Sequence, residues 1–268
     1  MYSGFVEVEK NTESNLFYWF FRQEQQTEDS ALVFWINGGP GSSSMLGNFI
    51  ENGPLKLVKD ANGQTRVHSL DGQSWTAVAN MVFVDQPVGV GYSYGHKKVT
   101  EMKQIGEDII KFFQGFYKKY PDMKQRKLYI SGESYAGKYL PGIASAIIDF
   151  NQDAQPDEKL NLEGVIIGNG FVDPIVQRMA IRQLAVSSGH VQFDSLPELD
   201  IIEKRCHDSN SVSDVDAPSI CGAAASFIRT INGGMNSYDI RFPESNSTIP
   251  KEIMVEYLND PQVVSQLH

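Results

Sequence analysis

The chain has 268 residues, 41% of them hydrophobic and 21% charged, an ordinary composition for a globular protein with one large core or two modest ones. Its formal net charge of −10 argues against nucleic acid and anionic membranes as partners. No apolar run approaches the roughly 20 residues of a membrane helix, and the N-terminus lacks the basic and apolar regions of a signal peptide.

The first part of the chain predicts strands. Residues 4–9 and 16–21 are rich in Val, Phe, Tyr and Trp and flank a polar segment, which indicates a β-hairpin with a long loop. Residues 31–36 form a continuous apolar run, typical of a strand that is buried on both faces, and residues 81–84 form another. Asn-Gly-Gly-Pro-Gly follows the first buried strand, and Asp-Gln-Pro follows the second. Both segments contain a proline, which a central strand does not tolerate, so each strand ends there.

Helices then alternate with strands. Apolar residues at three- and four-residue spacing over 102–120 predict a helix that Pro121 ends. Residues 127–131 predict a strand, a helix follows toward residue 150, and residues 164–167 predict a further strand. The alternation predicts an α/β fold with a mostly parallel sheet and helices on both faces.

The sequence becomes helical and polar after about Asp173. We expect an α/β core over residues 1–174. Over residues 175–268 we expect a helical insertion or cap, followed by the start of a return to the core. The second part contains both cysteines, Cys206 and Cys221, which could close a loop as a disulfide or remain free thiols.

Ser134 is the candidate nucleophile. It lies in Gly-Glu-Ser-Tyr-Ala, which matches a Gly-x-Ser-x-Gly elbow with Ala in the last place, between an apolar strand and a helix. Such a turn exposes the serine hydroxyl above the sheet edge, and the helix N-terminus behind it favours developing negative charge. The alternative is a plain strand-to-helix turn capped by serine.

The Asn-Gly-Gly-Pro-Gly segment at residues 37–41 favours the catalytic interpretation. A tetrahedral intermediate needs two N–H donors, one from the residue after the nucleophile, here Tyr135, and one from an earlier Gly-rich loop. The glycine spacing fits neither a dinucleotide fingerprint nor a P-loop. Together the two segments predict an α/β-hydrolase site.

These residues resemble the serine carboxypeptidase family, which has vacuolar, lysosomal and plant members. The two most specific segments are Asn-Gly-Gly-Pro-Gly and Gly-Glu-Ser-Tyr-Ala-Gly. The resemblance extends almost end to end, through residues 35–44, 51–54, 84–93, 130–139, 167–174 and 257–268. It departs at Ser42, where the family commonly has a cysteine.

The resemblance implies a role for each site residue. Ser134 attacks the scissile carbonyl, and the N–H groups of Gly39 and Tyr135 form the oxyanion hole. The free C-terminal carboxylate of a peptide is bound by Asn37, Glu51 and Glu133, with Trp35 supporting them. Crowded carboxyl groups have raised pKa values, so some of them can stay protonated and donate hydrogen bonds to that carboxylate.

A serine hydrolase of this fold orders its triad Ser, Asp, His. Only His190, His207 and His268 follow Ser134, and none follows a strand that would place it at the catalytic edge. The resemblance implies that the Asp and His lie in later segments absent from this sequence. We therefore expect a truncated chain that lacks the final strands of the sheet and that alone hydrolyses peptides slowly or not at all.

The leading functional prediction is a serine-type carboxypeptidase that releases C-terminal residues from peptides through an acyl-enzyme on Ser134. An acyltransferase on the same scaffold and a non-catalytic fragment remain open. We expect no cofactor or metal, peptide or protein C-termini as partners, and neither nucleic acid nor membrane. The resemblance implies a secretory, lysosomal, vacuolar or extracellular location, and it leaves side-chain preference and oligomeric state open.

Overall fold

The computed structural model describes residues 1–210, 217–236, 238–243 and 251–267. The chain forms two compact units. The first, here called the sheet unit, comprises Met1–Gly170 and Pro250–His268, and the second, the helical unit, comprises Phe171–Ile249. No helix among the described residues is long and apolar enough to cross a membrane.

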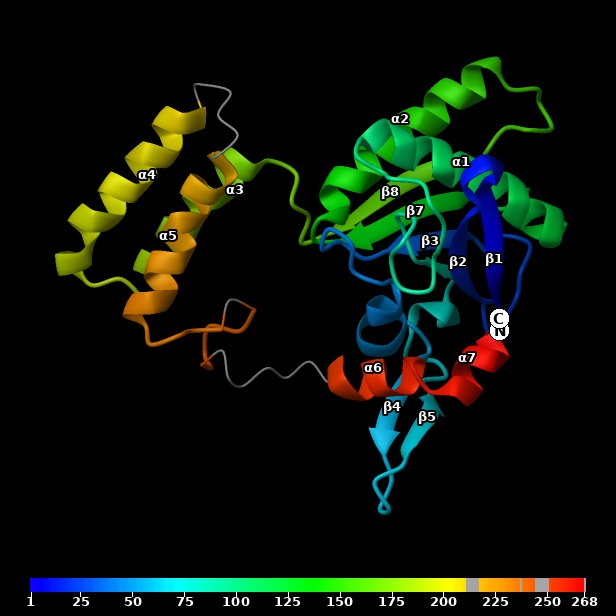
Figure 1. Cartoon of the computed structure of the whole chain (residues 1–268), viewed down its shortest axis with the longest axis horizontal. Helices are drawn as coiled ribbons and strands as arrows, with labels where there is room; N and C mark the ends of the chain where they lie inside the picture. The colour runs from blue at the N-terminus through cyan, green and yellow to red at the C-terminus, as the bar shows by residue number, and fades with distance from the viewer. Residues whose placement is uncertain (211–216, 237, 244–250, 268) are drawn as a thin grey trace. The chain divides into compact units, whose positions relative to one another are not determined.

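A six-stranded sheet forms the centre of the sheet unit, in the order β1-β2-β6-β3-β7-β8 (Figure 1). Strands β6, β3, β7 and β8 run parallel to one another, whereas β2 of the β1–β2 hairpin pairs with β6 in the antiparallel direction. The strands are β1 (Tyr2–Glu9), β2 (Ser14–Phe21), β3 (Leu32–Ile36), β6 (Asn80–Val84), β7 (Leu128–Glu133) and β8 (Leu162–Gly168). Every strand predicted from the sequence is present.

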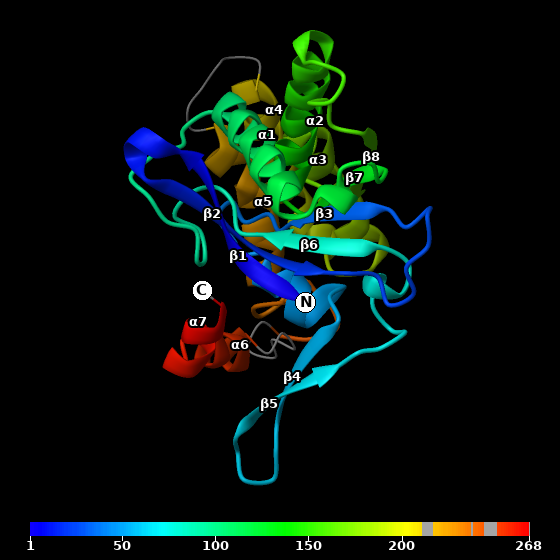
Figure 2. The same ribbon diagram turned by 90° about the vertical axis from the view of Figure 1, so that its right-hand side faces the viewer.

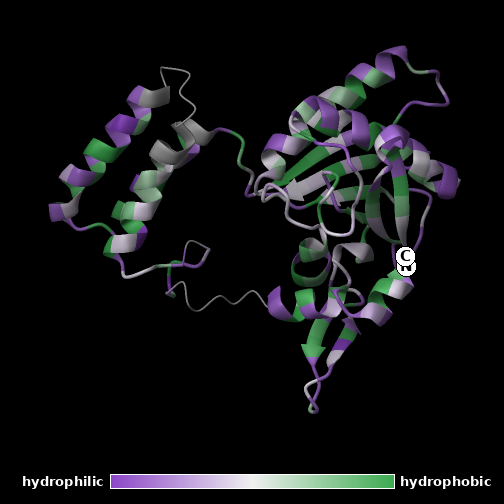
Figure 3. Ribbon diagram, in the orientation of Figure 1, coloured by the Kyte–Doolittle hydropathy of each residue, from purple (hydrophilic) through white to green (hydrophobic). Residues whose placement is uncertain are grey.

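Two helices, α1 (Met102–Lys119) and α2 (Ala136–Asp153), cover one face of this sheet (Figure 1). Helix α1 begins with a capping box between Glu101 and Gln104 and ends before Pro121, as its sequence predicts. Its apolar face, which includes Phe112 and Phe116, packs onto inward-facing residues of the central strands. The strands are hydrophobic, whereas both helices carry hydrophilic residues (Figure 3).

The opposite face of the sheet is covered by elements from two distant parts of the chain. They are the short π-helical turn η2 (Gly47–Glu51), the hairpin β4 (Leu55–Lys59)–β5 (Thr65–Ser69), and helices α6 (Lys251–Leu258) and α7 (Pro261–Leu267) (Figure 2). The contacts that join α6 and α7 to the rest of the sheet unit include Ser3 Oγ–Leu267 O at 2.9 Å, Lys59–Glu256 at 2.6 Å, and the Phe49 and Tyr257 rings at 5.7 Å.

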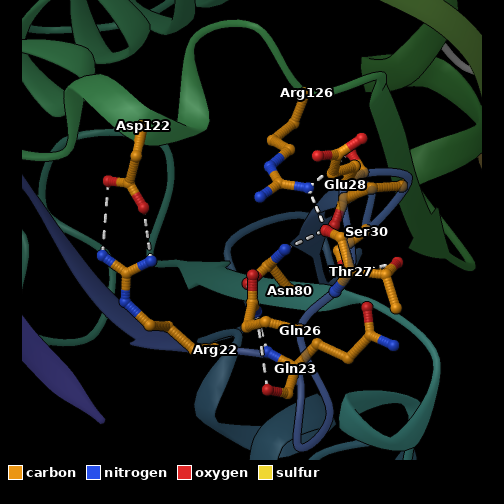
Figure 4. Close-up of polar contacts among 10 residues, drawn as sticks. Arg22, Gln23, Gln26, Thr27, Glu28, Ser30, Asn80, Asp122 and Arg126 are labelled. Carbon is orange, nitrogen blue, oxygen red and sulfur yellow. Dashed lines mark hydrogen bonds and ion pairs between the residues drawn. The ribbon is translucent and has the colours of Figure 1, made fainter.

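Polar contacts fix the loop between β2 and β3 at the edge where β3 begins (Figure 4). Arg22 pairs with Asp122 at 2.5 Å, and the Arg126 guanidinium donates to the Glu28 carbonyl at 2.6 Å. These contacts tie the loop that leads into β3 to the segment between α1 and β7.

The helical unit contains α3 (Pro174–Ser187), α4 (Leu196–Asn210) and α5 (Ala217–Ile231). Its small core is apolar and includes Ala185, Leu199 and Ile228. Cys206 is disulfide-bonded. The only other cysteine of the sequence is Cys221, whose side chain lies outside the described residues. Cys206 is therefore not a free thiol, which was one of the two alternatives left open by the sequence.

Candidate active site

Three neighbouring parallel strands end at one edge of the sheet, and their loops meet there. In the register of the sheet, Ile36 of β3 pairs with Gly132 of β7, and Trp35 pairs with Phe83 of β6. Because the carboxyl ends of parallel strands share an edge, the segments that follow them are brought together. These are the Asn-Gly-Gly-Pro-Gly loop, the Gly-Glu-Ser-Tyr-Ala turn and the Asp-Gln-Pro segment.

Ser134 occupies a sharp bend between β7 and α2. Its φ of 60° is in the left-handed region, and its N–H donates to the Gly168 carbonyl at 3.0 Å. A β-carbon placed on Gly132 would lie 2.2 Å from the Ile36 carbonyl oxygen, so the turn closes only with glycine there. Ser134 is half-buried and thus partly open to solvent, as an elbow nucleophile requires.

The glycine loop packs directly against this bend. A β-carbon placed on Gly38 would lie 2.3 Å from the Tyr135 nitrogen and 2.7 Å from the Glu133 carbonyl oxygen. The next residue, Gly39, is exposed, and its φ of 107° strongly favours glycine. The backbone around Gly39 and the start of helix α2 therefore lie beside Ser134.

Asn37 links the predicted carboxylate-binding residues. Its side-chain oxygen accepts hydrogen bonds from Trp35 Nε1 at 2.9 Å and from the Gly47 N–H at 3.1 Å. Its amide nitrogen must therefore face the other way, where it donates to Glu51 at 3.1 Å and to Glu133 at 3.2 Å. Asn37 is fully buried, and both hydrogens of its amide are used to hold the two carboxyl groups close together.

The carboxyl group of Glu51 is electrostatically crowded. Burial, and then repulsion by Glu133, raise the pKa of Glu51 to about 7, while the hydrogen bond from Asn37 lowers it. The residue as a whole is exposed, so the shift reflects the surroundings of the carboxyl group rather than a closed cavity. A neutral Glu51 can donate a hydrogen bond, which an ionised one cannot.

Asp85, at the same edge, received no role in the sequence analysis. It directly follows β6 and is fully buried. Burial raises its pKa to about 6, against the hydrogen bonds from Ser43, Tyr92 and Ser44 that lower it. The signal in the sequence was a carboxyl residue immediately after the buried strand β6. In the sheet, β6 lies next to β3, the strand that leads into the glycine loop.

The histidines are not joined to Ser134 within the described residues. His190 shares a hydrogen bond with Ser188 at 2.8 Å, and the His207 imidazole lies 3.8 Å from the Asp208 carboxylate. Both belong to the helical unit, and His268 lies outside the described residues.

Comparisons with known proteins identify the family. A sequence profile described as serine carboxypeptidase matches residues 1–268. Carboxypeptidase Y from Candida albicans is 34% identical, and the alignment covers 99% of this chain and 50% of that protein. The pheromone-processing carboxypeptidase KEX1 from Tuber melanosporum is 41% identical over 76% of this chain and 32% of its own length. The chain thus spans about half the length, or less, of the curated relatives that it matches.

Among solved structures, the chain resembles Kex1, a prohormone-processing carboxypeptidase from Saccharomyces cerevisiae, with a TM-score of 0.85 and 24% sequence identity. The alignment covers 99% of this chain and 63% of that one. This likeness and the mostly parallel sheet confirm the expected α/β-hydrolase-type fold. The chain belongs to the serine carboxypeptidase family.

Proposed function

We propose that this chain carries the nucleophile, the oxyanion pocket and the substrate-carboxylate site of a serine carboxypeptidase. The supporting observation is the Asn37 amide, which binds both Glu51 and Glu133, the residue that directly precedes Ser134. A hydrolase that recognises a free peptide C-terminus needs a carboxylate-binding group beside its nucleophile, and this arrangement provides one.

Catalysis then proceeds in two steps through an acyl-enzyme. The Ser134 hydroxyl gives its proton to a base, and its oxygen attacks the carbonyl carbon of the last peptide bond. The carbonyl oxygen becomes an oxyanion that accepts hydrogen bonds from the N–H groups of Gly39 and Tyr135. Cleavage of the C–N bond releases the C-terminal residue, whose amine takes up a proton, and water then hydrolyses the Ser134 ester.

The carboxylate of the substrate binds at Asn37, Glu51 and Glu133. A protonated Glu51 donates a hydrogen bond to one carboxylate oxygen, whereas two ionised glutamates would repel the substrate. Trp35 acts through Asn37, because the hydrogen bond from its indole fixes which side of the amide faces the two glutamates.

The general base and the carboxylate that orients it are assigned to none of the described residues. A base typically contributes 10²–10⁴-fold to the rate, and without one a serine hydroxyl is a weak nucleophile at neutral pH. We therefore expect slow or no peptide hydrolysis by the 268-residue chain alone. The disulfide at Cys206 supports a location in the secretory pathway or beyond, because disulfides persist in oxidising compartments.

The test is a peptidase assay on the natural protein that carries this chain, with N-blocked dipeptides ending in a free carboxylate or in an amide. We expect release of the last residue from the free acid, at least about tenfold slower release from the amide, and no release by Ser134→Ala. Equal rates on both substrates would contradict the carboxylate site. Product formed only with an added alcohol would indicate an acyltransferase instead.

A further inference from the structure

Asp85 directly follows β6, at the edge of the sheet where the Ser134 turn lies, and it hydrogen-bonds to both the sheet and the glycine loop. Its N–H donates to the Phe17 carbonyl of β2 at 3.0 Å, and its own carbonyl accepts the Ser93 hydroxyl at 2.6 Å. Ser93 in turn accepts the Phe17 N–H at 2.7 Å. The backbone of Asp85 is therefore anchored to the sheet on both sides.

The buried carboxylate of Asp85 binds two different segments. Its Oδ1 accepts the Ser43 hydroxyl at 2.7 Å and the Ser44 N–H at 2.8 Å, both from the glycine loop. Its Oδ2 accepts the Tyr92 N–H at 3.0 Å. A β-carbon on Gly91 would lie 1.9 Å from Oδ2, so the surrounding backbone closes tightly on this group.

These contacts continue into the turn that contains Gly39. The Ser44 hydroxyl donates to the Val84 carbonyl at 2.5 Å and accepts the Asn37 N–H at 3.1 Å. Within the turn, the Ser42 N–H donates to the Gly38 carbonyl at 3.2 Å. Both ends of the turn are thereby held, one through Asn37 and the other through Asp85.

A carboxylate suits this place better than a neutral amide. The Asp85 carboxylate accepts three hydrogen bonds, two at Oδ1 from Ser43 and Ser44 and one at Oδ2 from Tyr92. An asparagine has one acceptor oxygen, so its NH₂ group would have to face at least one of these donors. An ionised group without hydrogen bonds would be costly at full burial, so the carboxylate and its donors depend on one another.

We propose that Asp85 is a positioning residue for the oxyanion pocket. Its carboxylate holds the Gly38–Ser44 turn so that the Gly39 N–H points to the same place as the Tyr135 N–H. This inference rests on the function proposed above. It gives a role to the segment after β6, which matches the family in sequence but to which the resemblance assigned no role.

The test compares Asp85→Asn with a matched control, Asp108→Asn. Asp108 is also a buried aspartate of the sheet unit, but it lies on α1, and its carboxylate pairs with Lys97 at 2.6 Å. Hydrogen exchange of the 268-residue chain measures the amides of residues 38–44 and needs no activity. We expect Asp85→Asn to speed the exchange of these amides at least about tenfold, which corresponds to a loss of about 1.4 kcal/mol of local stability. In Asp108→Asn, the exchange rates of these amides should stay unchanged relative to those of the rest of the sheet unit.

Kinetics of the natural protein supply the second readout. Asp85→Asn should lower kcat by about 10²-fold and leave KM within about twofold, because an oxyanion donor acts in the transition state. Ser43→Ala, which removes one donor and keeps the carboxylate, should act in the same direction more weakly, and it serves as the test if Asp85→Asn does not fold.

Two outcomes would overturn the proposal: unchanged exchange in residues 38–44, or losses of kcat that match those of Asp108→Asn. An inactive wild-type protein would count against the proposed function instead. In that case the exchange experiment would still decide whether Asp85 holds the turn.

Discussion

At the scale of single residues, the orientation of the Asn37 amide determines the chemistry of the carboxylate cluster. Trp35 and Gly47 both donate to its oxygen, which leaves its nitrogen for Glu51 and Glu133. Each glutamate keeps acceptor or donor capacity for a ligand. The pKa of Glu51, raised to about 7, places the change in its charge near neutral pH.

The pH dependence of peptide binding should follow Glu51. In the proposed site, the Glu51 carboxyl is protonated below about pH 7 and can donate to the substrate carboxylate, and above that pH it is ionised and repels it. KM for a peptide with a free C-terminus should therefore rise roughly tenfold as the pH passes through this value. Glu51→Gln should remove the rise in a KM–pH profile, whereas Glu163→Gln, on an exposed residue paired with Lys127, should keep it. A profile that is unchanged in Glu51→Gln would contradict the assignment.

The same group should affect stability without any substrate. Since its folded-state pKa is raised from 4.5 to about 7, the folded chain binds a proton in that window that the unfolded chain has lost. Its contribution to the free energy of unfolding therefore falls as pH rises through the window. Because Glu51 is exposed and screened by solvent, the fall should be at most about 1 kcal/mol and absent in Glu51→Gln. Urea unfolding at several pH values measures it.

At the scale of elements, the site depends on how closely two loops approach. Gly38 of the loop after β3 has no room for a side chain, because Tyr135 and Glu133 of the elbow occupy that space. The loop after β6 lies on the other side of β3 and holds the far end of the same turn. The proposed oxyanion pocket thus depends on loops that follow neighbouring strands rather than on one motif.

Gly38→Ala should separate the glycine loop from the elbow. The added methyl group would meet the Tyr135 nitrogen at 2.3 Å, so backbone must move and one oxyanion donor is displaced. We expect kcat of the natural protein on an N-blocked dipeptide to fall by about 10²–10³-fold. The matched control is Gly142→Ala in α2, whose new methyl group meets Met102 at an ordinary 3.6 Å. Full activity in Gly38→Ala would show that the two loops do not form the pocket.

The sequence predicts the elements of the sheet unit best where hydrophobic periodicity is strong. The strands of the central sheet and helix α1 have clear apolar patterns, and all are observed near their predicted bounds. The hairpin β4–β5 was not predicted, because most of its residues are polar and exposed. Its one signal was the Asn62–Gly63 pair at the turn, a dipeptide favoured in tight hairpin turns.

The approach of Glu51 to Asn37 could be expected only from the family resemblance. Glu51 is the last residue of the π-helical turn η2, whose Gly47 packs against Trp35 and Asn37. No apolar period marks such a turn, and close packing around a glycine depends on contacts that local sequence does not encode.

At the scale of the whole molecule, the sheet unit is built from two segments that are distant in the sequence, Met1–Gly170 and Pro250–His268. Helices α6 and α7 return to the face opposite α1 and α2, through contacts such as Phe49–Tyr257 that no local pattern predicts. Strand β8 pairs only with β7 among the described strands, and Val165, Ile166 and Ile167 are 37–41% exposed along it. An apolar strand edge of this kind is available for further pairing.

The most direct test of the account is peptide mapping after treatment of the natural protein with a fluorophosphonate, which reacts with an activated serine. We predict a single phosphonylated residue, Ser134, and no labelling in Ser134→Ala. A folded protein in which Ser134 stays unmodified, or in which another serine takes the label, would contradict the claim that the bend after β7 presents the nucleophile beside the glycine loop.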